Sequence, residues 1–340
     1  MEQEMKILIT GAQGFIGKNL VKELRNRGYH NLMTYDHGNT VAELEGFCEE
    51  AEFIFHLAGV NRPKDTKEFM EGNHDFTAVL LELLKKHENT APIMISSSIQ
   101  ASLDNPYGES KRAGENLMFS YGEQTGARVL VYRFPNVFGK WSRPNYNSVI
   151  ATFCHNIARD LPIQVNDPHA VLNLVYIDDV VEALCLALEG KETKEGNFCV
   201  VPITHSATLG EISSTIYSFK QSRETLMIPD MSNALVKKLY STYLSFLPEE
   251  RFSYALKMNK DHRGSFTEFL KTNDFGQVSV NISKPGITKG NHWHHTKNEK
   301  FLVVHGQGVI RFRKIGSEEV LEYYTSGEKL EVVDIPTGYT

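Results

Sequence analysis

The sequence predicts an α/β protein in two parts: a doubly wound parallel sheet, followed by an all-β barrel that is incomplete at its C-terminus. First, short apolar runs alternate with helical patterns up to about residue 180, which is typical of a parallel sheet covered by helices. Second, turn sequences such as Lys284-Pro285-Gly286 divide the apolar runs beyond about residue 252, as in antiparallel sheets. Third, four of the 13 histidines lie between His292 and His305.

In the first part, apolar runs predict strands and amphipathic segments predict helices. The expected strands are 6–10, 53–57, 93–97 and 129–133, and the expected helices are 15–27 and 67–86. A mostly helical stretch, 181–250, follows. Further strands are expected at 277–282, 300–304, 308–313, 321–324 and 330–335. No Gly/Ser linker separates the parts, and we place the two domains at 1–248 and 249–340.

The composition narrows the classes of protein and partner. The chain has 340 residues, of which 41% are apolar and 23% are charged, and its net charge is -6. This charge disfavours nucleic acid and anionic membrane surfaces as partners. The four cysteines form no C-x-x-C pair, which indicates reduced thiols in a cytoplasmic protein. No run of about 18 apolar residues is available to cross a membrane.

A glycine-rich segment, TGAQGFIG, follows the first expected strand and opens the first expected helix. Glycines in this context allow a tight turn and bring backbone N–H groups close to a pyrophosphate. The positive end of the helix dipole favours the same anion. The segment therefore predicts a dinucleotide site. Its candidate cofactor-binding residues are Gly11, Gly14, Phe15, Ile16 and Gly17.

An aspartate ends the second apolar run of the chain. Asp36 follows NLMTY, and a carboxylate at this position can accept hydrogen bonds from the adenosine ribose diol. Asp36 therefore favours NADH over NADPH, although the neighbouring His37 could soften that preference.

A tyrosine and a lysine stand four residues apart in NPYGESK, residues 105–111. On a helix, Tyr107 and Lys111 share a face, and the ammonium is expected to lower the pKa of the phenol. Tyr107 could then exchange a proton with a carbonyl oxygen while a hydride moves. Three serines end the preceding strand, and the last of them, Ser98, is our candidate for holding the same oxygen.

Six segments resemble, in order, the extended short-chain dehydrogenase/reductases, a family of sugar-nucleotide epimerases, dehydratases and reductases. They are TGAQGFIG, HLAG at 56–59, SSS at 96–98, YGESK at 107–111, RFPNVFG at 133–139 and YIDD at 176–179. The resemblance covers roughly residues 4–240 and implies a Rossmann-type fold with a nicotinamide cofactor. It also implies that Ser98, Tyr107 and Lys111 are catalytic and that Lys111 contacts the cofactor.

The same resemblance implies where the substrate binds. Asn136 would lie near both cofactor and substrate, and the segment FGKWSRPNYNSVIATF would line the nucleotide-sugar pocket. Within that segment Arg143, Asn145 and Asn147 could donate to phosphate or ring hydroxyl groups. A polar surface loop is the alternative interpretation of these three residues.

The histidine-rich segment reads GITKGNHWHHTKNEKFLVVHG. In a strand, His292 and His294 would share one face, and Glu299 would come from the following turn or strand. Two imidazoles and a carboxylate suit Zn²⁺ or another divalent first-row metal. This spacing resembles the first motif of the cupin barrels, and we expect a divalent metal here, with Zn²⁺ the first candidate.

Two further segments extend the cupin resemblance. DHRGSFTE resembles the substrate strand of cupin-class deoxysugar epimerases, which implies that Arg263 holds phosphate and Glu268 is a second polar contact. The second cupin motif, P-x-G-x-x-H, is matched by Pro336 and Gly338 and breaks off at Thr340. We therefore expect a shortened cupin domain with weakened metal binding.

Together the two parts resemble the bifunctional capsular polysaccharide enzymes of the UDP-N-acetyl-L-fucosamine pathway. The resemblance implies C3 epimerisation of a UDP-4-keto-6-deoxy-N-acetylhexosamine in the cupin domain. The reductase domain would then reduce the C4 ketone to UDP-N-acetyl-6-deoxy-L-talosamine. It also implies NADPH as cofactor, with NADH possible because of Asp36, and a homodimer.

Two alternatives remain. One is a nucleotide-sugar 4-epimerase or dehydratase that holds NAD tightly. Ile99 and Gln100 follow Ser98, where dehydratases of this family tend to carry acidic residues, so they count against dehydration. The other is a dinucleotide-binding sensor or scaffold protein, which would not need the complete set of Ser98, Tyr107 and Lys111.

Overall fold

The computed structural model describes residues 4–274 and 276–340. The chain forms two compact units. The first comprises Met1–Ala255 with Leu270–Gln277, and the second comprises Leu256–Phe269 with Val278–Thr340. In the described residues, no helix is long and apolar enough to cross a membrane.

A parallel sheet organises the first unit. Its strand order is β2-β1-β3-β4-β5-β9-β8, and only β8 runs antiparallel to its neighbour. The strands are β1 Ile7–Thr10, β2 Leu32–Tyr35, β3 Phe53–His56, β4 Ile93–Ser98, β5 Val129–Phe134, β8 Lys194–Glu195 and β9 Phe198–Cys199. The order reverses between β1 and β3. Ligands of such sheets bind at the carboxyl ends of the strands at this reversal.

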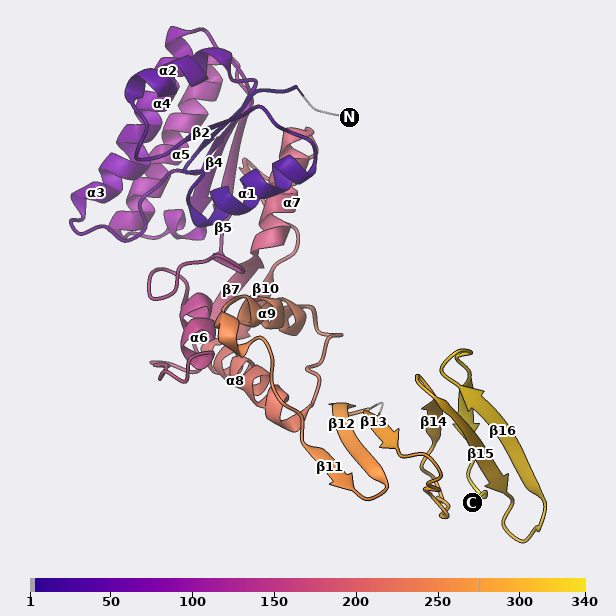
Figure 1. Ribbon diagram of the computed structural model, residues 1–340. Helices are drawn as coiled ribbons and strands as arrows, with labels where there is room; N and C mark the ends of the chain where they lie inside the picture. Colours follow the sequence, from indigo (N-terminus) through magenta and orange to yellow (C-terminus); the bar gives the residue numbers. More distant parts are fainter. Residues whose placement is uncertain (1–3, 275) are drawn as a thin grey trace. The chain divides into compact units, whose positions relative to one another are not determined.

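Helices cover both faces of the sheet, as the alternating pattern predicts. Figure 1 shows α2, α4 and α5 on one face, and α1 and α7 on the other. Their bounds are α1 Phe15–Asn26, α2 Val41–Glu50, α4 Phe76–Lys86, α5 Pro106–Thr125 and α7 Ile177–Leu188. Each face of the sheet has its own apolar core. The expected Rossmann-type α/β fold is therefore confirmed.

Helix α5, which carries Tyr107 and Lys111, begins and ends at clear sequence signals. The side chain of Asn105 accepts a hydrogen bond from Gly108 N at 2.9 Å, and Pro106 occupies the first turn. Both residues suit a helix start, because a polar cap satisfies a free N–H and proline needs none. At the other end Gly126 takes a left-handed φ of 75°, which glycine adopts without strain.

The helix expected at 67–86 is present, but it contains a π-helical turn that the sequence did not predict. The structure divides it into α3 Lys67–Met70, a π-helical turn η1 Glu71–Asp75, and α4. The turn contains Asn73, whose buried amide accepts from Val60 N and donates to Val60 O, both at 3.0 Å. Apolar periodicity does not detect such a turn, because the hydrogen bonds that accompany it join the Asn73 side chain to a segment outside the helix.

The rest of the first unit forms a smaller lobe. A three-stranded sheet, β10-β7-β6, packs with three helices around a core that includes Phe153, Phe219 and Tyr243. The elements are β6 Asn136–Phe138, β7 Val171–Tyr176, β10 His205–Thr208, α6 Val149–Ile157, α8 Leu209–Thr225 and α9 Ala234–Ser245. Two short 3₁₀ turns, η2 Ile99–Ser102 and η3 Glu249–Arg251, lie in the connections.

The C-terminal strands pair in antiparallel fashion, as the turn-rich pattern predicts. They form the sheets β11-β12-β13, β14-β17 and β15-β16. Their bounds are β11 Met258–Asp261, β12 Gly264–Thr272, β13 Gly276–Ser283, β14 Glu299–Leu302, β15 Gln307–Arg313, β16 Val320–Ser326 and β17 Val332–Ile335. Phe312 and Val333 are buried here, whereas Tyr324 is 75% exposed.

Candidate active site

The glycine-rich turn joins β1 to α1 at the point where the strand order reverses. Gly11 has φ 71° and donates its N–H to Tyr35 O at 2.8 Å, which ties the turn to β2. A Cβ at Gly17 would lie 2.2 Å from Gly11 O. Glycine at 17 therefore allows the helix to pack directly on the turn, a close approach that dinucleotide-binding folds use.

The start of α1 fits the pyrophosphate of a nicotinamide cofactor. Gly14 is its N-cap and supplies no side-chain hydrogen bond, so the first N–H groups of the helix are not capped by a side chain at that position. A Cβ at Gly14 would meet only Gly11 O, at 3.0 Å. Backbone donors and the helix dipole together favour an anion at this place. Phe15, Ile16 and Gly17 form the first turn of α1.

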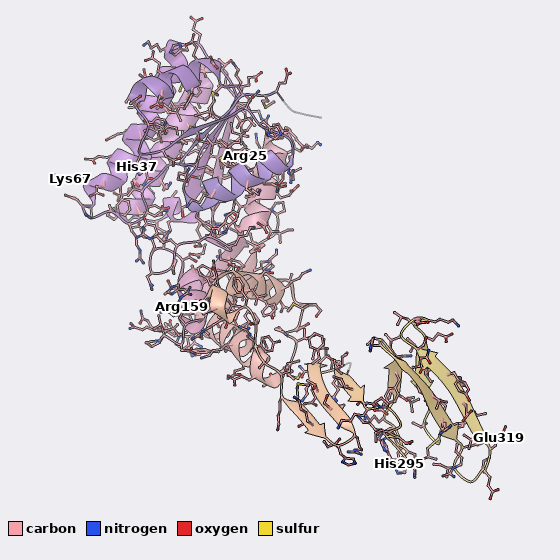
Figure 2. All side chains as sticks on the ribbon, viewed as in Figure 1. Arg25, His37, Lys67, Arg159, His295 and Glu319 are labelled. Carbon is pink, nitrogen blue, oxygen red and sulfur yellow. The ribbon has the colours of Figure 1, made fainter. Side chains whose placement is uncertain are left out.

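Asp36 lies directly after β2 and faces the glycine-rich turn. Its two carboxylate oxygens accept from Gln13 N at 3.0 and 3.2 Å, and its own N–H donates to Asn39 Oδ1 at 2.9 Å. Both ends of the residue are thus fixed. The neighbouring His37 is exposed (Figure 2).

Tyr107, Lys111 and Ser98 come together as the sequence predicts. Lys111 Nζ lies 5.9 Å from the centre of the Tyr107 ring and donates to Ser96 O at 3.1 Å. Ser98 ends β4 and hydrogen-bonds the phenol of Tyr107. Phe69 of α3 also packs against the Tyr107 ring, with ring centres 5.6 Å apart.

The expected lowering of the phenol pKa is wrong. Burial raises the pKa of Tyr107 above its ordinary value, and the hydrogen bond with Ser98 opposes this only in part. Burial also lowers the pKa of Lys111 to about 8, with Glu115 acting in the opposite direction. Desolvation disfavours the charged form of each group and sets the direction of both shifts. A neutral phenol is the form that donates a proton.

Glu115 was not identified from the sequence. This glutamate on α5 is 2% exposed and accepts from Ser97 Oγ at 2.5 Å. Arg133 of β5 donates to it twice, from Nε at 2.8 Å and from a terminal nitrogen at 2.6 Å. The available signal was a charged residue four positions after Lys111 on the face of the helix that packs against the sheet.

A second buried network of hydrogen bonds runs from Thr10, just before the glycine-rich turn, to Thr77 of α4. His56, at the end of β3, lies between Thr10 Oγ1 at 2.7 Å and Thr77 Oγ1 at 2.9 Å. Thr10 Oγ1 accepts from Ala58 N, and Thr77 Oγ1 donates to Asn73 O. The Thr10 hydroxyl is therefore free to donate to Nδ1, and the imidazole proton belongs on Nε2. Burial, then the nearby Lys111, lowers the pKa of His56 to about 3.

The expected substrate contacts are distributed around the loop after β6. Asn136 is exposed, and its amide donates to Asn173 O at 2.9 Å. Arg143 stacks over the Tyr146 ring, 5.1 Å from its centre. Asn145 takes a left-handed φ of 53°, and Asn147 is exposed. These groups do not form a common cluster of hydrogen bonds.

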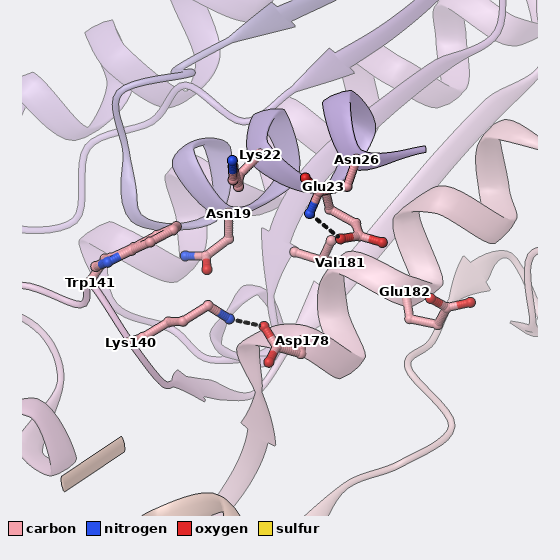
Figure 3. Close-up of a pocket in the computed structure, with 9 residues that line it drawn as sticks. All are labelled: Asn19, Lys22, Glu23, Asn26, Lys140, Trp141, Asp178, Val181 and Glu182. Atoms are coloured by element: carbon pink, nitrogen blue, oxygen red, sulfur yellow. Dashed lines mark hydrogen bonds and ion pairs between the residues drawn. The ribbon is translucent and has the colours of Figure 1, made fainter. Parts of the chain in front are cut away.

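A separate pocket lies between α1, α7 and the loop at Lys140 and Trp141 (Figure 3). The carboxylate of Asp178 is paired with the Lys140 ammonium inside it. Asn19 also lines the pocket, and its Oδ1 is buried without a hydrogen-bond partner among the described residues. Lys140 and Trp141 belong to the segment expected to line the nucleotide-sugar pocket, but Arg143, Asn145 and Asn147 do not line this pocket, and neither do Ser98, Tyr107 and Lys111.

The histidine-rich segment departs from expectation. His292 and His294 lie in irregular chain between β13 and β14, not in a strand, with ring centres 5.0 Å apart. His294 Nε2 lies 3.7 Å from Glu299 Oε2, while Lys297 Nζ lies 2.6 Å from the other oxygen. His295 (labelled in Figure 2) packs against Trp293, with ring centres 4.4 Å apart.

This arrangement does not fit a three-ligand metal site. Within residues 4–274 and 276–340, no three His, Cys, Asp or Glu side chains gather closely enough to hold a metal ion. One feature points the other way: His294 Nε2 is buried and has no hydrogen-bond partner among the described residues. Such an atom would ordinarily be paired.

Arg263, the residue expected to bind phosphate, forms hydrogen bonds within its own turn. Its guanidinium donates to Asp261 Oδ2 from two nitrogens, at 2.9 and 2.7 Å. Glu268 lies on β12 and is half-buried. A ligand phosphate would therefore compete with Asp261 for the arginine.

Two family models match the chain. The NAD dependent epimerase/dehydratase family matches residues 7–201. The chain belongs to this family. A polysaccharide biosynthesis C-terminal domain matches residues 259–340.

One curated relative and one solved structure each match nearly the whole chain, and a more distant structure matches part of it. It is 46% identical to a UDP-2-acetamido-2,6-beta-L-arabino-hexul-4-ose reductase of Pseudomonas aeruginosa, covering 99% of this chain and 90% of the relative. The structure of the capsular polysaccharide assembling protein CapF of Staphylococcus aureus matches with a TM-score of 0.93 and 56% identity, covering 99% of this chain and 91% of that one. A Thermus thermophilus UDP-glucose 4-epimerase, 23% identical with a TM-score of 0.55, covers 63% of this chain and shares the fold.

Proposed function

We propose that the protein is a nicotinamide-dependent reductase of a UDP-linked 4-keto-6-deoxy-N-acetylhexosamine in polysaccharide precursor synthesis. The observation that carries the proposal is the meeting of Tyr107, Lys111 and Ser98 at the end of β4, beside the glycine-rich turn. The near full-length similarity to a reductase of such a substrate supports the same activity.

The residues have distinct roles in this proposal. The bound cofactor would supply the hydride to C4 of the sugar. Tyr107 would donate its proton to the C4 oxygen as that oxygen gains charge, since its raised pKa keeps the phenol protonated. Ser98 would hold the same oxygen by hydrogen bonding. Lys111 would stabilise the negative charge that remains on Tyr107 after the transfer.

The residues for cofactor and sugar binding are proposed from the same arrangement. Asp36 and the first turn of α1 would hold the ribose and pyrophosphate, with Asn136 beside the nicotinamide. For the nucleotide sugar, the proposed contacts are Arg143, Asn145 and Asn147. The product would be UDP-N-acetyl-6-deoxy-L-talosamine.

We further propose C3 epimerisation in the C-terminal domain, which we place at 249–340, as a cupin-type activity. A ketone at C4 acidifies the C3 proton, which a base removes and an acid returns on the opposite face. Arg263 and Glu268 are the proposed substrate contacts. His292, His294 and Glu299 are the proposed metal ligands, supported by the unpartnered His294 Nε2 but not by the spacing of the set.

The test is to supply the 4-keto sugar nucleotide with NADPH or NADH and to follow oxidised cofactor and reduced sugar together. Equal amounts of the two are expected. Failure to oxidise either cofactor, with no C4 alcohol formed, would count against the reductase and favour a 4-epimerase or a dehydratase that holds NAD tightly.

A further inference from the structure

The buried face of α5 meets β4 through three successive serines. Tyr107, Lys111 and Glu115 stand four residues apart and therefore lie in one row on the helix. Their partners are Ser98 for Tyr107, the Ser96 carbonyl for Lys111 and the Ser97 hydroxyl for Glu115. Two members of the row belong to the proposed reductase site, and the third has no role in the mechanism above.

Glu115 is the best-anchored member of this row. Its side chain is 2% exposed and receives three hydrogen bonds, from Ser97 and twice from Arg133. Charge-assisted and bidentate bonds of this kind are short and directional. Arg133 in turn stacks on Phe198, with its guanidinium carbon 3.8 Å from the ring centre. Through these contacts, β4, β5 and β9 fix the position of α5.

Lys111 needs a nearby anion. It is 8% exposed, and its ammonium donates to one backbone carbonyl, Ser96 O. A buried ammonium loses its proton more easily than one in water. Arg133, the partner of Glu115, has a side chain 27% exposed, so water screens the arginine charge more than the carboxylate.

The other titratable groups around Lys111 do not supply this charge. His56 of β3 is buried and neutral at ordinary pH, because burial lowers its pKa to about 3. Tyr107 is neutral because burial raises its pKa. On η1, His74 Nδ1 and Asp75 Oδ1 pair with each other, 2.7 Å apart, with His74 half-buried and Asp75 exposed. Asn73 and Gly59, which also border Lys111, carry no charge.

We propose that Glu115 is a positioning residue of the reductase site, which holds α5 in register with β4 and keeps Lys111 in its charged form. This inference rests on the proposed reductase function. It assigns a task to Ser97 and Arg133 as well, since both orient the carboxylate. None of the three touches the reacting atoms.

Two variants with opposite expected effects test the proposal. The reaction needs protonated Lys111, so activity is present below the pKa of Lys111 and is lost as pH rises through it. Glu115→Gln removes the compensating charge, and the alkaline loss of kcat/KM should begin about one pH unit lower. Arg133→Gln leaves Glu115 without its counter-charge, and the loss should begin at higher pH. Glu123→Gln, on the exposed side of the same helix, should match the unmodified protein.

A second measurement does not depend on turnover. The difference in unfolding free energy between the Lys111→Met variant and the parent changes as Lys111 titrates. The pH at the midpoint of this change should fall when Glu115→Gln is added to both proteins, and it should rise when Arg133→Gln is added instead. Equal loss of kcat at every pH, with unmoved midpoints, would show that Glu115 only supports the fold and would overturn the inference. If the unmodified protein oxidises no cofactor, the reductase proposal fails. The pH midpoints of the stability difference would still show whether Glu115 keeps Lys111 in its charged form.

Discussion

Lys111 lies with its Nζ 5.9 Å from the centre of the Tyr107 ring, and the same nitrogen donates to Ser96 O at 3.1 Å. The lysine is therefore bonded to the strand while it lies within electrostatic reach of the tyrosine. Because burial disfavours charge on both groups, the resting pair is a neutral phenol beside an ammonium with a lowered pKa. This relationship defines an acid that is ready to donate.

The Tyr107→Phe variant should lose ketone reduction by a factor on the order of 10²–10⁴, the usual contribution of a positioned acid. Cofactor binding should be retained, because the glycine-rich turn is unchanged. Tyr121→Phe is the matched control: this tyrosine of the same helix donates to Asn89 O, at 2.8 Å. Turnover by the Tyr107→Phe variant close to that of the control would remove Tyr107 from the mechanism.

Replacing Lys111 with methionine should stabilise the fold at neutral pH, by on the order of 2 kcal/mol. Burial lowers the pKa of Lys111 from 10.5 to about 8, so between these values the unfolded chain binds more protons than the folded one. Stability from this group therefore rises with pH across that window, and the advantage of the variant should shrink above about pH 8. Denaturant unfolding at several pH values measures it. A constant advantage at all pH values would contradict the assigned shift.

The carboxylate of Asp36 should make NADH bind more tightly than NADPH, by about tenfold or more, because it repels a 2′-phosphate and accepts from a ribose hydroxyl. In Asp36→Asn the preference should narrow or reverse. Quenching of protein fluorescence gives both dissociation constants without turnover. The same measurement on His37→Gln tests whether the neighbouring His37 side chain weakens the preference for NADH. Tighter binding of NADPH by the unmodified protein would show that Asp36 does not face the ribose.

Two glycine substitutions should act in opposite directions. Gly17→Ala places a Cβ 2.2 Å from Gly11 O, and the forced shift should cost about 1–3 kcal/mol and weaken cofactor binding. Gly46→Ala, within α2 where a Cβ would meet nothing within 4 Å, should stabilise by roughly 0.5–1 kcal/mol. Chemical denaturation of both variants measures the contrast. A tolerated alanine at position 17 would argue against close packing of α1 on the turn.

Zinc binding at the histidine-rich segment should be weak and should depend on His294. Titration with Zn²⁺ followed by thermal unfolding should give a small upward shift that His294→Ala removes. His295→Ala is the matched control, because His295 packs on Trp293 instead, with ring centres 4.4 Å apart. An equal zinc response in both variants would place the metal elsewhere.

The first strands and helices of the N-terminal unit followed closely from local pattern, whereas β8, β9 and β10 lie within the stretch 181–250 that was expected to be mostly helical. Apolar runs and caps such as Asn105 are short-range signals, and the strands ended within a residue or two of their expected positions. The π-helical turn at Asn73 could not be predicted in this way, because the side-chain amide of Asn73 forms its hydrogen bonds with the backbone of Val60. Contacts between distant segments leave no periodic trace in a sequence.

For the candidate site as well, features that depend on local spacing could be predicted, and features that depend on contacts between distant segments could not. Tyr107 and Lys111 share a helix face, so their spacing alone brought them together. The direction of the phenol pKa and the role of Glu115 depend on burial between α5, β4 and β5, which spacing does not encode. The expectation that His292 and His294 share a strand is wrong for a related reason, because the segment folds as irregular chain.

The most direct test of the central claim is the stoichiometry of one reaction. The protein would be given the UDP-4-keto-6-deoxy-N-acetylhexosamine with NADPH and, separately, NADH, and both oxidised cofactor and reduced sugar would be quantified. The account predicts one cofactor oxidised for each C4 ketone reduced, with loss of both in Tyr107→Phe. Formation of the C4 alcohol without matching cofactor oxidation, or no oxidation of either cofactor, would contradict it.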